Sequence, residues 1–240
     1  MEGDRLVHLQ SNLNKLPSDL EELFEHILFS TIDLDSYKTD TAHMFLVTLA
    51  AHDTLPLMSY WFIDQKGPEV VKRLEIKPMT VQQIKKRLGN MEKRVSACTK
   101  GLLEVRFFDS EDNDDASLSS SVLFNWKVDF LHRTARDFLI NPRVRAKLEE
   151  WAGCDFDVNF TISEAILSQI KTAPQERLYF ENGGPIEKLR ETFYYHAERV
   201  VADRGVPLIG ELRRTITQHE SLREGLEAGM TKLHFESIIN

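Results

Sequence analysis

The stretch VDFLHRTARDFLI, residues 128–140, contains a change of hydrophobic period. Val128 and Phe130 alternate with polar residues as on one face of a strand, whereas the apolar residues between 135 and 139 recur at helical spacing. His132 lies where the period changes, and strand alternation predicts that it points inward with Val128 and Phe130. The stretch therefore predicts a strand that leads directly into a helix.

The residues before this stretch complete the local prediction. Apolar residues spaced three or four apart over 81–98 predict a helix, in which Gly89 allows a helix-turn-helix break. The segments GLLEVRFF (101–108) and LFNWKVDFLH (123–132) have the branched and aromatic residues of strands, and an acidic, serine-rich loop, 109–121, separates them. Helix, helix, hairpin and helix over about 79–140 is the order of a winged-helix unit.

Helical spacing dominates elsewhere. A capping-box pattern at Thr161 and Glu164 predicts the start of one helix. The next helix carries apolar residues over 186–200 and is predicted to stop at Gly205, with Pro207 just beyond and one or two shorter helices after it. The predicted fold is mainly α: a helical bundle with an embedded winged-helix unit (short β-hairpin) and a C-terminal helical segment. The predicted divisions are a helical domain 1–78, a winged-helix-like domain 79–150 and the C-terminal segment 151–240.

Composition narrows the class of protein. The chain has 240 residues, 42% of them hydrophobic and 28% charged, which is typical of a globular protein. Its net charge of −8 gives the whole chain no electrostatic attraction for nucleic acid or anionic membrane. Two distant cysteines, a start without a secretory signal and the lack of a run long enough to span a bilayer predict a cytoplasmic protein.

Motifs for catalysis are missing from the sequence. No glycine pattern fits a phosphate-binding loop, no G-x-S-x-G elbow occurs, and the histidines and cysteines match no metal-ligand spacing. Cys98 continues an apolar stripe, so it is interpreted as a core residue. The sequence predicts no enzyme activity, no cofactor and no metal.

A basic helix offers an alternative function. Residues 80–106 contain seven Lys or Arg against two Glu, and Lys85, Lys86, Lys93 and Arg94 lie off the apolar stripe of the helix. Winged helices often place such a helix in the major groove. However, the acidic loop would lie at the wing tip, where a DNA-binding wing needs positive charge. A solvated helix face is the default interpretation, and nucleic acid is not the expected partner.

His132 has two interpretations. The first is a buried histidine hydrogen-bonded to backbone. The second is an inward imidazole at a helix N-terminus beside Arg133, which would suit an anionic group. Residue spacing favours the first.

Three segments carry a family resemblance. LPSDLEELFEHIL (16–28), GLLEV (101–105) and VDFLHRTARDFLI resemble, in order and approximate spacing, the region downstream of the NACHT nucleotide-binding domain in fungal NOD-like receptor proteins. These are signal-transduction ATPases of the STAND class, and the resemblance covers roughly residues 1–170. It implies a helical domain and a winged helix that follow a nucleotide switch.

The resemblance also implies roles for residues. The family's winged-helix histidine approaches the phosphate of bound ADP, which places His132, with Arg133 beside it, at a nucleotide-sensing position. The implied structural frame comprises Phe130, Leu131, Asp137, Phe138 and Leu139. The family's phosphate-binding loop lies upstream, so we expect either a detached piece of such a receptor or a stand-alone protein. The expected function is a non-catalytic regulatory scaffold that packs against a NACHT domain in cis or in trans, with His132 structural in this chain.

Overall fold

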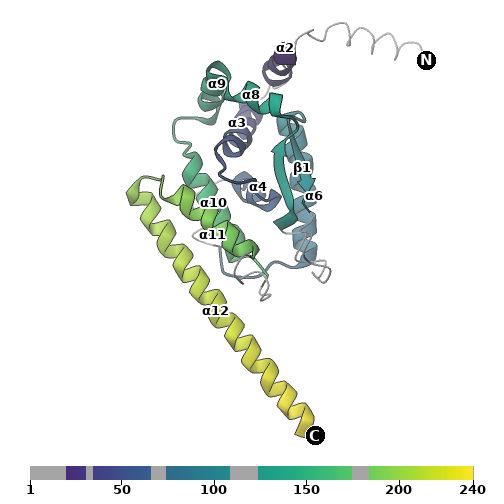
Figure 1. Cartoon of the computed structure of the whole chain (residues 1–240), viewed down its shortest axis with the longest axis vertical. Helices are drawn as coiled ribbons and strands as arrows, with labels where there is room; N and C mark the ends of the chain where they lie inside the picture. The colour runs from purple at the N-terminus through teal and green to yellow at the C-terminus, as the bar shows by residue number, and fades with distance from the viewer. Residues whose placement is uncertain (1–19, 31–34, 66–73, 109–123, 175–183, 240) are drawn as a thin grey trace, which may run out of the picture.

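The computed structural model describes residues 20–30, 35–65, 74–108, 124–174 and 184–239. Within these ranges most residues are helical, and the one sheet has two antiparallel strands. Figure 1 shows the two strands beside α6 at one side of the helical body, while the last helix runs past α11 and extends beyond the body. The predicted mainly α-helical bundle with a short hairpin is confirmed.

The structure describes the following helices and strands. In chain order they are α2 (Leu20–Glu25), the π-helical turn η1 (His26–Ser30), α3 (Asp35–Ala50), α4 (Leu57–Asp64), α6 (Val81–Thr99), β1 (Leu103–Phe107), β2 (Trp126–Phe130), α8 (Arg133–Ile140), α9 (Pro142–Ala152), α10 (Val158–Lys171), α11 (Pro185–Ala197) and α12 (Ala202–Ile239).

The hairpin is formed as the alternating segments predict. Its register pairs Leu103 with Phe130 and Phe107 with Trp126. Alternate residues such as Leu103, Val128 and Phe130 are buried, because one face of the sheet packs on the helices. The predicted acidic loop, 109–121, lies outside the described residues. The predicted hairpin is therefore present, whereas the winged-helix unit stays a prediction.

Helix α6 is continuous through Gly89, so the suggested break at that glycine is wrong. Thr80 caps the helix: its hydroxyl accepts from the Gln83 N–H, and the Gln83 side chain accepts from the Thr80 N–H. This is a capping box. One face buries an apolar stripe consisting of Ile84, Leu88, Met91, Val95 and Cys98. The cap and the stripe outweigh the roughly 1 kcal/mol that a glycine costs inside a helix.

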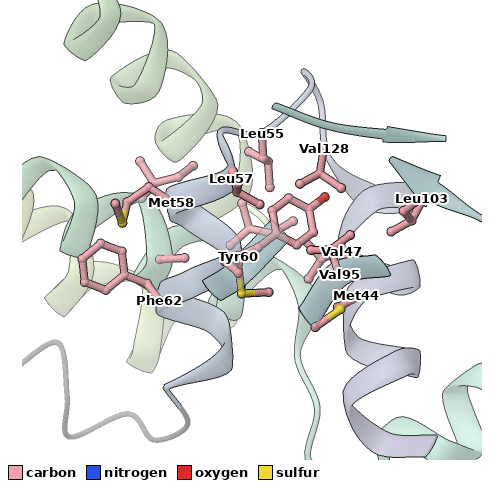
Figure 2. Close-up of a cluster of buried hydrophobic side chains, with 14 of the residues drawn as sticks. Met44, Val47, Leu55, Leu57, Met58, Tyr60, Phe62, Val95, Leu103 and Val128 are labelled. Carbon is pink, nitrogen blue, oxygen red and sulfur yellow. The ribbon is translucent and has the colours of Figure 1, made fainter. Parts of the chain in front are cut away.

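The hydrophobic core joins elements from most of the chain. Figure 2 shows buried side chains of α3, α4, α6 and both strands converging around Tyr60. The Tyr60 hydroxyl is hydrogen-bonded to Thr48 Oγ1 at 2.8 Å, and burial raises the pKa of this phenol. A single cluster of buried apolar residues runs from Phe24 to Leu212 and includes all three predicted divisions. The division into domains stays a prediction.

The C-terminal helices begin at positions that the sequence pattern did not identify. Helix α10 starts at Val158 because Asp157 is its N-cap, with Oδ1 accepting from the Phe160 N–H at 3.0 Å. Thr161 is one turn inside this helix and its hydroxyl donates to the Asp157 carbonyl, so the capping box predicted there is wrong. An aspartate caps a helix as well as a threonine does, and Asp157 comes earlier.

The region around Gly205 is the start of a helix and not the predicted end of one. Helix α12 spans 38 residues, in place of the one or two short helices expected, and Gly205 and Pro207 lie in its first turns. A Cβ on Gly205 would lie 2.9 Å from the Ala197 carbonyl oxygen at the end of α11. The glycine is therefore required for the close crossing of α11 and α12, and it does not serve as a C-cap.

Candidate interaction surface at the β2–α8 corner

Helix α8 is capped by His132. The backbone of His132 is extended (φ −152°, ψ 153°), and its Nδ1 accepts from the Thr134 N–H at 3.2 Å. The Thr134 hydroxyl lies 2.9 Å from the same nitrogen. A ring nitrogen that accepts carries no proton, so in the neutral imidazole the proton lies on Nε2. The ring thus caps the helix with one nitrogen and keeps an N–H donor on the other.

The prediction that the His132 side chain points inward is wrong, because His132 is exposed. The strand ends at Phe130, and the next two residues bend into the helix, so alternation no longer applies at position 132. Val128 and Phe130, which lie within the strand, are buried as predicted. The histidine remains structural, but as a helix cap and not as a core group.

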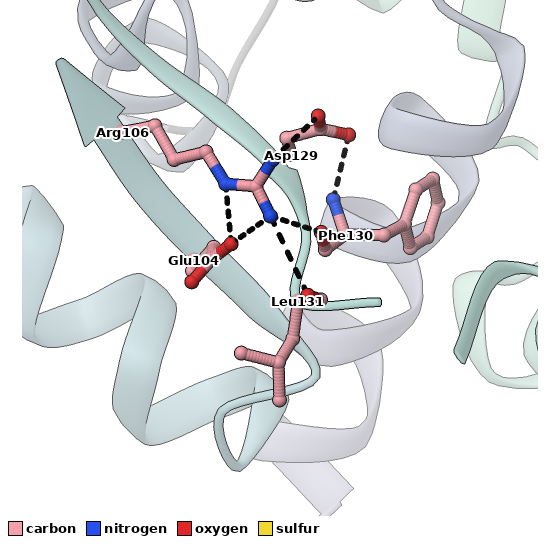
Figure 3. Close-up of polar contacts among 5 residues, drawn as sticks. All are labelled: Glu104, Arg106, Asp129, Phe130 and Leu131. Carbon is pink, nitrogen blue, oxygen red and sulfur yellow. Dashed lines mark hydrogen bonds and ion pairs between the residues drawn. The ribbon is translucent and has the colours of Figure 1, made fainter. Parts of the chain in front are cut away.

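Arg106 holds the end of β2. Figure 3 shows its guanidinium facing Glu104, Asp129 and the carbonyls of Phe130 and Leu131. Its Nη2 donates to both carbonyls at 3.4 Å, and Nη1 lies 3.7 Å from an Asp129 carboxylate oxygen. Sequence reasoning missed this arginine, although alternation in paired strands places Glu104, Arg106 and Asp129 on one face once the register is known.

Helix α8 has two contrasting faces. Ala135, Phe138 and Leu139 are buried, and the Phe138 ring lies 5.5 Å from that of Phe24. On the opposite face Arg133 is exposed and its Nε lies 3.6 Å from Asp137. Leu131 before the helix is 50% exposed and Ile140 at its end 43%. We define the β2–α8 corner as Leu131, His132, Arg133, Arg136 and Ile140, all of which are exposed.

This corner could recognise a partner by three kinds of contact. Leu131 and Ile140 offer apolar area, the two arginines offer charge and bidentate hydrogen bonds, and the His132 Nε2–H offers a directed donor. Of the implied frame, Phe130, Phe138 and Leu139 are buried, whereas Leu131 and Asp137 are exposed. The frame residues therefore divide between the core and the corner.

The basic residues of α6 are not equivalent. Lys85, Lys86 and Lys93 are exposed. Arg94 instead donates to Asp64 at 2.5 Å and to Asp40 at 2.6 Å, joining α6 to α3 and α4. Arg94 therefore does not belong with the exposed lysines, because its charge is already paired within the fold.

A buried polar cluster lies between α10 and α11, and sequence reasoning missed it. His196 is fully buried, its Nδ1–H donates to Asn159 Oδ1 at 2.9 Å, and its Nε2 accepts from the His52 N–H at 3.4 Å. Burial, together with the nearby Arg199 and His52, lowers the pKa of His196 from 6.5 to about 4. These partners are 37 and 144 positions from His196, so no local spacing could reveal them.

A buried cation fastens α12 to the body. Lys171 at the end of α10 is 2% exposed, lies 2.6 Å from Glu211 of α12, and donates to the Leu74 carbonyl at 3.3 Å. Eight residues after Glu211, His219 of α12 is hydrogen-bonded to the Ile170 carbonyl at 2.9 Å, and burial lowers the pKa of His219. Both groups are committed to holding helices together.

The described residues offer no support for a metal site or a membrane span. They contain no group of three or more His, Cys, Asp or Glu side chains placed to hold a metal ion. Within the same residues, no helix combines the length and apolarity that crossing a bilayer requires. The β2–α8 corner is thus the candidate site that residue chemistry and exposure support best.

Part of the chain matches a known protein family. The family described as "Domain of unknown function (DUF7791)" matches residues 28–179. No curated protein and no solved structure matches the chain. The matched region includes both the hairpin and the β2–α8 corner.

Proposed function

The chain belongs to the DUF7791 family, a domain of unknown function, and from its geometry we propose that it is a non-catalytic interaction scaffold. In this proposal the β2–α8 corner packs against a nucleotide-binding domain of the NACHT type, in cis or in trans. The observation that carries the proposal is the exposure of the corner. Two apolar residues, two arginines and a histidine N–H face solvent on a helix whose other face is buried.

The chemistry of the corner suits such a partner. Exposed Leu131 and Ile140 are the kind of apolar residues that form the centre of an interface, and arginine is enriched at interfaces. The Nε2–H of His132, beside Arg133 and Arg136, would donate to a phosphate or carboxylate oxygen at the partner's surface. Support for a NACHT-type partner comes from the resemblance of residues 16–28, 101–105 and 128–140.

The proposal also covers regulation and location. A scaffold that contacts the phosphates of bound ADP would favour the ADP-bound state of its partner, because a ligand shifts an equilibrium only by its differential affinity. We place this activity in the cytoplasm, in a signalling context. Support for a reducing compartment comes from Cys98 and Cys154, which are both free thiols.

The experiment measures binding to a purified NACHT domain loaded with ADP, loaded with ATP or empty. The wild-type chain should bind the ADP-loaded domain most tightly. The variant Leu131→Asp/Ile140→Asp should weaken binding by about tenfold or more, because charges would replace exposed apolar contacts. The matched control is Val201→Asp/Val206→Asp, which changes two even more exposed apolar residues at the α11–α12 crossing and should bind normally.

A histidine variant tests the donor separately from the fold. His132→Asn keeps an N-cap acceptor but removes the Nε2–H, so it should fold normally and lose the preference for the ADP-loaded domain. Equal binding by the corner variant and its control would contradict the proposal. An increase in the melting temperature of the isolated chain on addition of ADP would show a nucleotide site within the chain, which the proposal excludes.

The alternative is a winged-helix protein that binds nucleic acid through α6. The exposure of Lys85, Lys86 and Lys93 favours it, whereas the ion pairs of Arg94 remove one of its four basic groups. Binding to duplex DNA at physiological salt, abolished by reversing the charges of Lys85 and Lys86, would replace the scaffold proposal.

A further inference from the structure

Three lysines lie in a row along the exposed face of α6. Lys86, Lys93 and the C-cap residue Lys100 are each seven residues apart and exposed. Seven residues nearly complete two helical turns, so Lys86 and Lys93 fall within about 20° of one another around the axis and about 10.5 Å apart along it. Lys100 follows after the same number of residues and ends the helix with a left-handed backbone (φ 52°). We call these three residues the α6 lysine row.

The charge of this row is not neutralised within the fold. None of the three lysines forms an ion pair with any part of the chain that the structure describes. Glu92 is the one acidic residue of α6, and it lies about 100° around the axis from Lys93. Because the chain carries a net charge of −8, a local row of unpaired cations differs from its surroundings.

The row is presented on a rigid support. The opposite face of α6 is buried along its length, from Ile84 to Cys98. Between Lys86 and Lys93 lies Gly89, and a Cβ added there would meet nothing within 4 Å. No contact with the described part of the chain therefore requires a glycine at this position. Its missing side chain leaves room beside the lysines for the backbone of another helix.

We propose that the α6 lysine row docks an acidic helix of a partner protein, with carboxylates at seven-residue intervals facing Lys86, Lys93 and Lys100. The lysines and the carboxylates match in spacing as well as in opposite charge. A helix that lies alongside α6 repeats its side chains every seven residues, at the same interval of about 10.5 Å. The partner backbone would approach at Gly89. This surface is distinct from the β2–α8 corner, so the inference does not depend on the function proposed above.

The flanks of the row favour an acidic helix over nucleic acid. A helix inserted in the major groove has phosphates on both sides and therefore needs cations on both flanks. On one flank Glu92 offsets the charge of Lys85, which lies on the same side of the helix. On the other flank the guanidinium of Arg87 lies over the Trp61 ring and that of Arg94 is bound by Asp40 and Asp64. Neither flank therefore presents a line of free cations to phosphates, whereas the row itself matches a single row of carboxylates.

The test measures binding of a designed helical peptide with glutamate at every seventh position and alanine at the positions beside it. Fluorescence anisotropy with the full chain should show saturable binding that weakens as salt is added. Lys86→Glu/Lys93→Glu should weaken binding by about tenfold, the effect of reversing two exposed ion pairs. A peptide with lysine in place of glutamate should restore binding to this double variant.

Lys85→Glu is the matched control, because Lys85 is exposed on the same helix but lies about 100° from Lys86. Its effect should be less than about twofold. Equal weakening by Lys85→Glu would show a diffuse attraction and overturn the docking row. The inference would also fail if a DNA duplex bound more tightly than the acidic peptide at physiological salt, since that result would assign the row to nucleic acid.

Discussion

His196 and His132 show what burial does to the same side chain in two regions of this molecule. We call the buried contact between α10 and α11, which includes Asn159, Phe193 and His196, the α10–α11 seam. In this seam His196 is fully buried, and both of its ring nitrogens are hydrogen-bonded to residues from other parts of the chain. At the β2–α8 corner, His132 is exposed and binds only the adjacent Thr134. The seam uses its polar groups for stability, whereas the corner leaves an N–H available. The two regions should therefore respond differently to substitution.

Replacing a large apolar side chain with alanine should give the largest difference in unfolding free energy between the seam and the corner. Phe193→Ala in the seam removes a ring that is fully buried, and it should lower the free energy of unfolding by about 3–5 kcal/mol. Leu131→Ala at the corner should change it by only about 0.5 kcal/mol. Urea unfolding at neutral pH measures both values. If Leu131→Ala lowered the free energy of unfolding about as much as Phe193→Ala does, the proposed difference between the corner and the seam would be contradicted.

The second largest effect is expected from acid, which should lower the stability of the seam. The pKa of His196 is lowered from 6.5 to about 4, so the folded state favours the neutral ring. Its contribution to stability is complete above about pH 6.5 and is lost as the pH falls through about 4, a loss of about 3 kcal/mol. Urea unfolding at a series of pH values from about 7 to about 4 measures this loss.

His196→Gln provides the comparison for the acid effect, because glutamine does not titrate. The pKa of His219 is also lowered by burial, so its effect has the same sign and persists in the variant. Only the difference between the two pH profiles belongs to His196. Identical slopes would mean that protonation of His196 does not disturb the seam.

Two glycines give a third comparison, of intermediate size. Gly205→Ala should lower the free energy of unfolding by about 1–3 kcal/mol, since its Cβ would lie 2.9 Å from the Ala197 carbonyl oxygen. Gly89→Ala meets no atom within 4 Å and should stabilise the chain by about 0.5–1 kcal/mol. Thermal unfolding of both variants measures the opposite signs. Stabilisation by Gly205→Ala would show that α11 and α12 separate easily.

The smallest effect is expected at the corner itself. His132→Ala removes an N-cap and should cost about 1 kcal/mol, whereas His132→Asn keeps the cap and should cost a few tenths. Urea unfolding of the two variants distinguishes capping from packing. A cost of about 2 kcal/mol or more for both would indicate that the imidazole contributes by burial.

The fold was largely predictable because local period determines it. The apolar stripe of 81–98 predicted α6, and alternation in the two branched segments predicted the hairpin. Errors arose where one residue type serves two purposes. Gly205, followed by Pro207, has the sequence pattern of a helix end, but it permits the close crossing of two helices. Strand alternation was extended to His132, although the strand ends two residues earlier, at Phe130. Helix starts and strand ends depend on a single residue, which period alone does not locate.

The candidate site was predictable only in part. His132 and Arg133 were identified by resemblance and do lie together at an exposed corner. Arg106 was missed because its role depends on strand register, and Arg94 could not be separated from the lysines because its carboxylate partners are 30 and 54 positions away. Ion pairs between residues so far apart in the sequence depend on tertiary packing, so the residue pattern of α6 alone cannot predict them.

Asn141 ends α8 and begins α9, its side chain accepting from the Arg143 N–H at 3.1 Å. At its other end α8 is separated from β2 by only Leu131 and His132. In the proposed complex, neither connection at the ends of α8 therefore needs to become ordered, and the entropy lost there on association would come chiefly from side-chain rotamers. Arg133 and Arg136 have the most rotamers to lose. The affinity of the corner should thus depend more on how firmly a partner fixes two guanidinium groups than on any rearrangement of the chain.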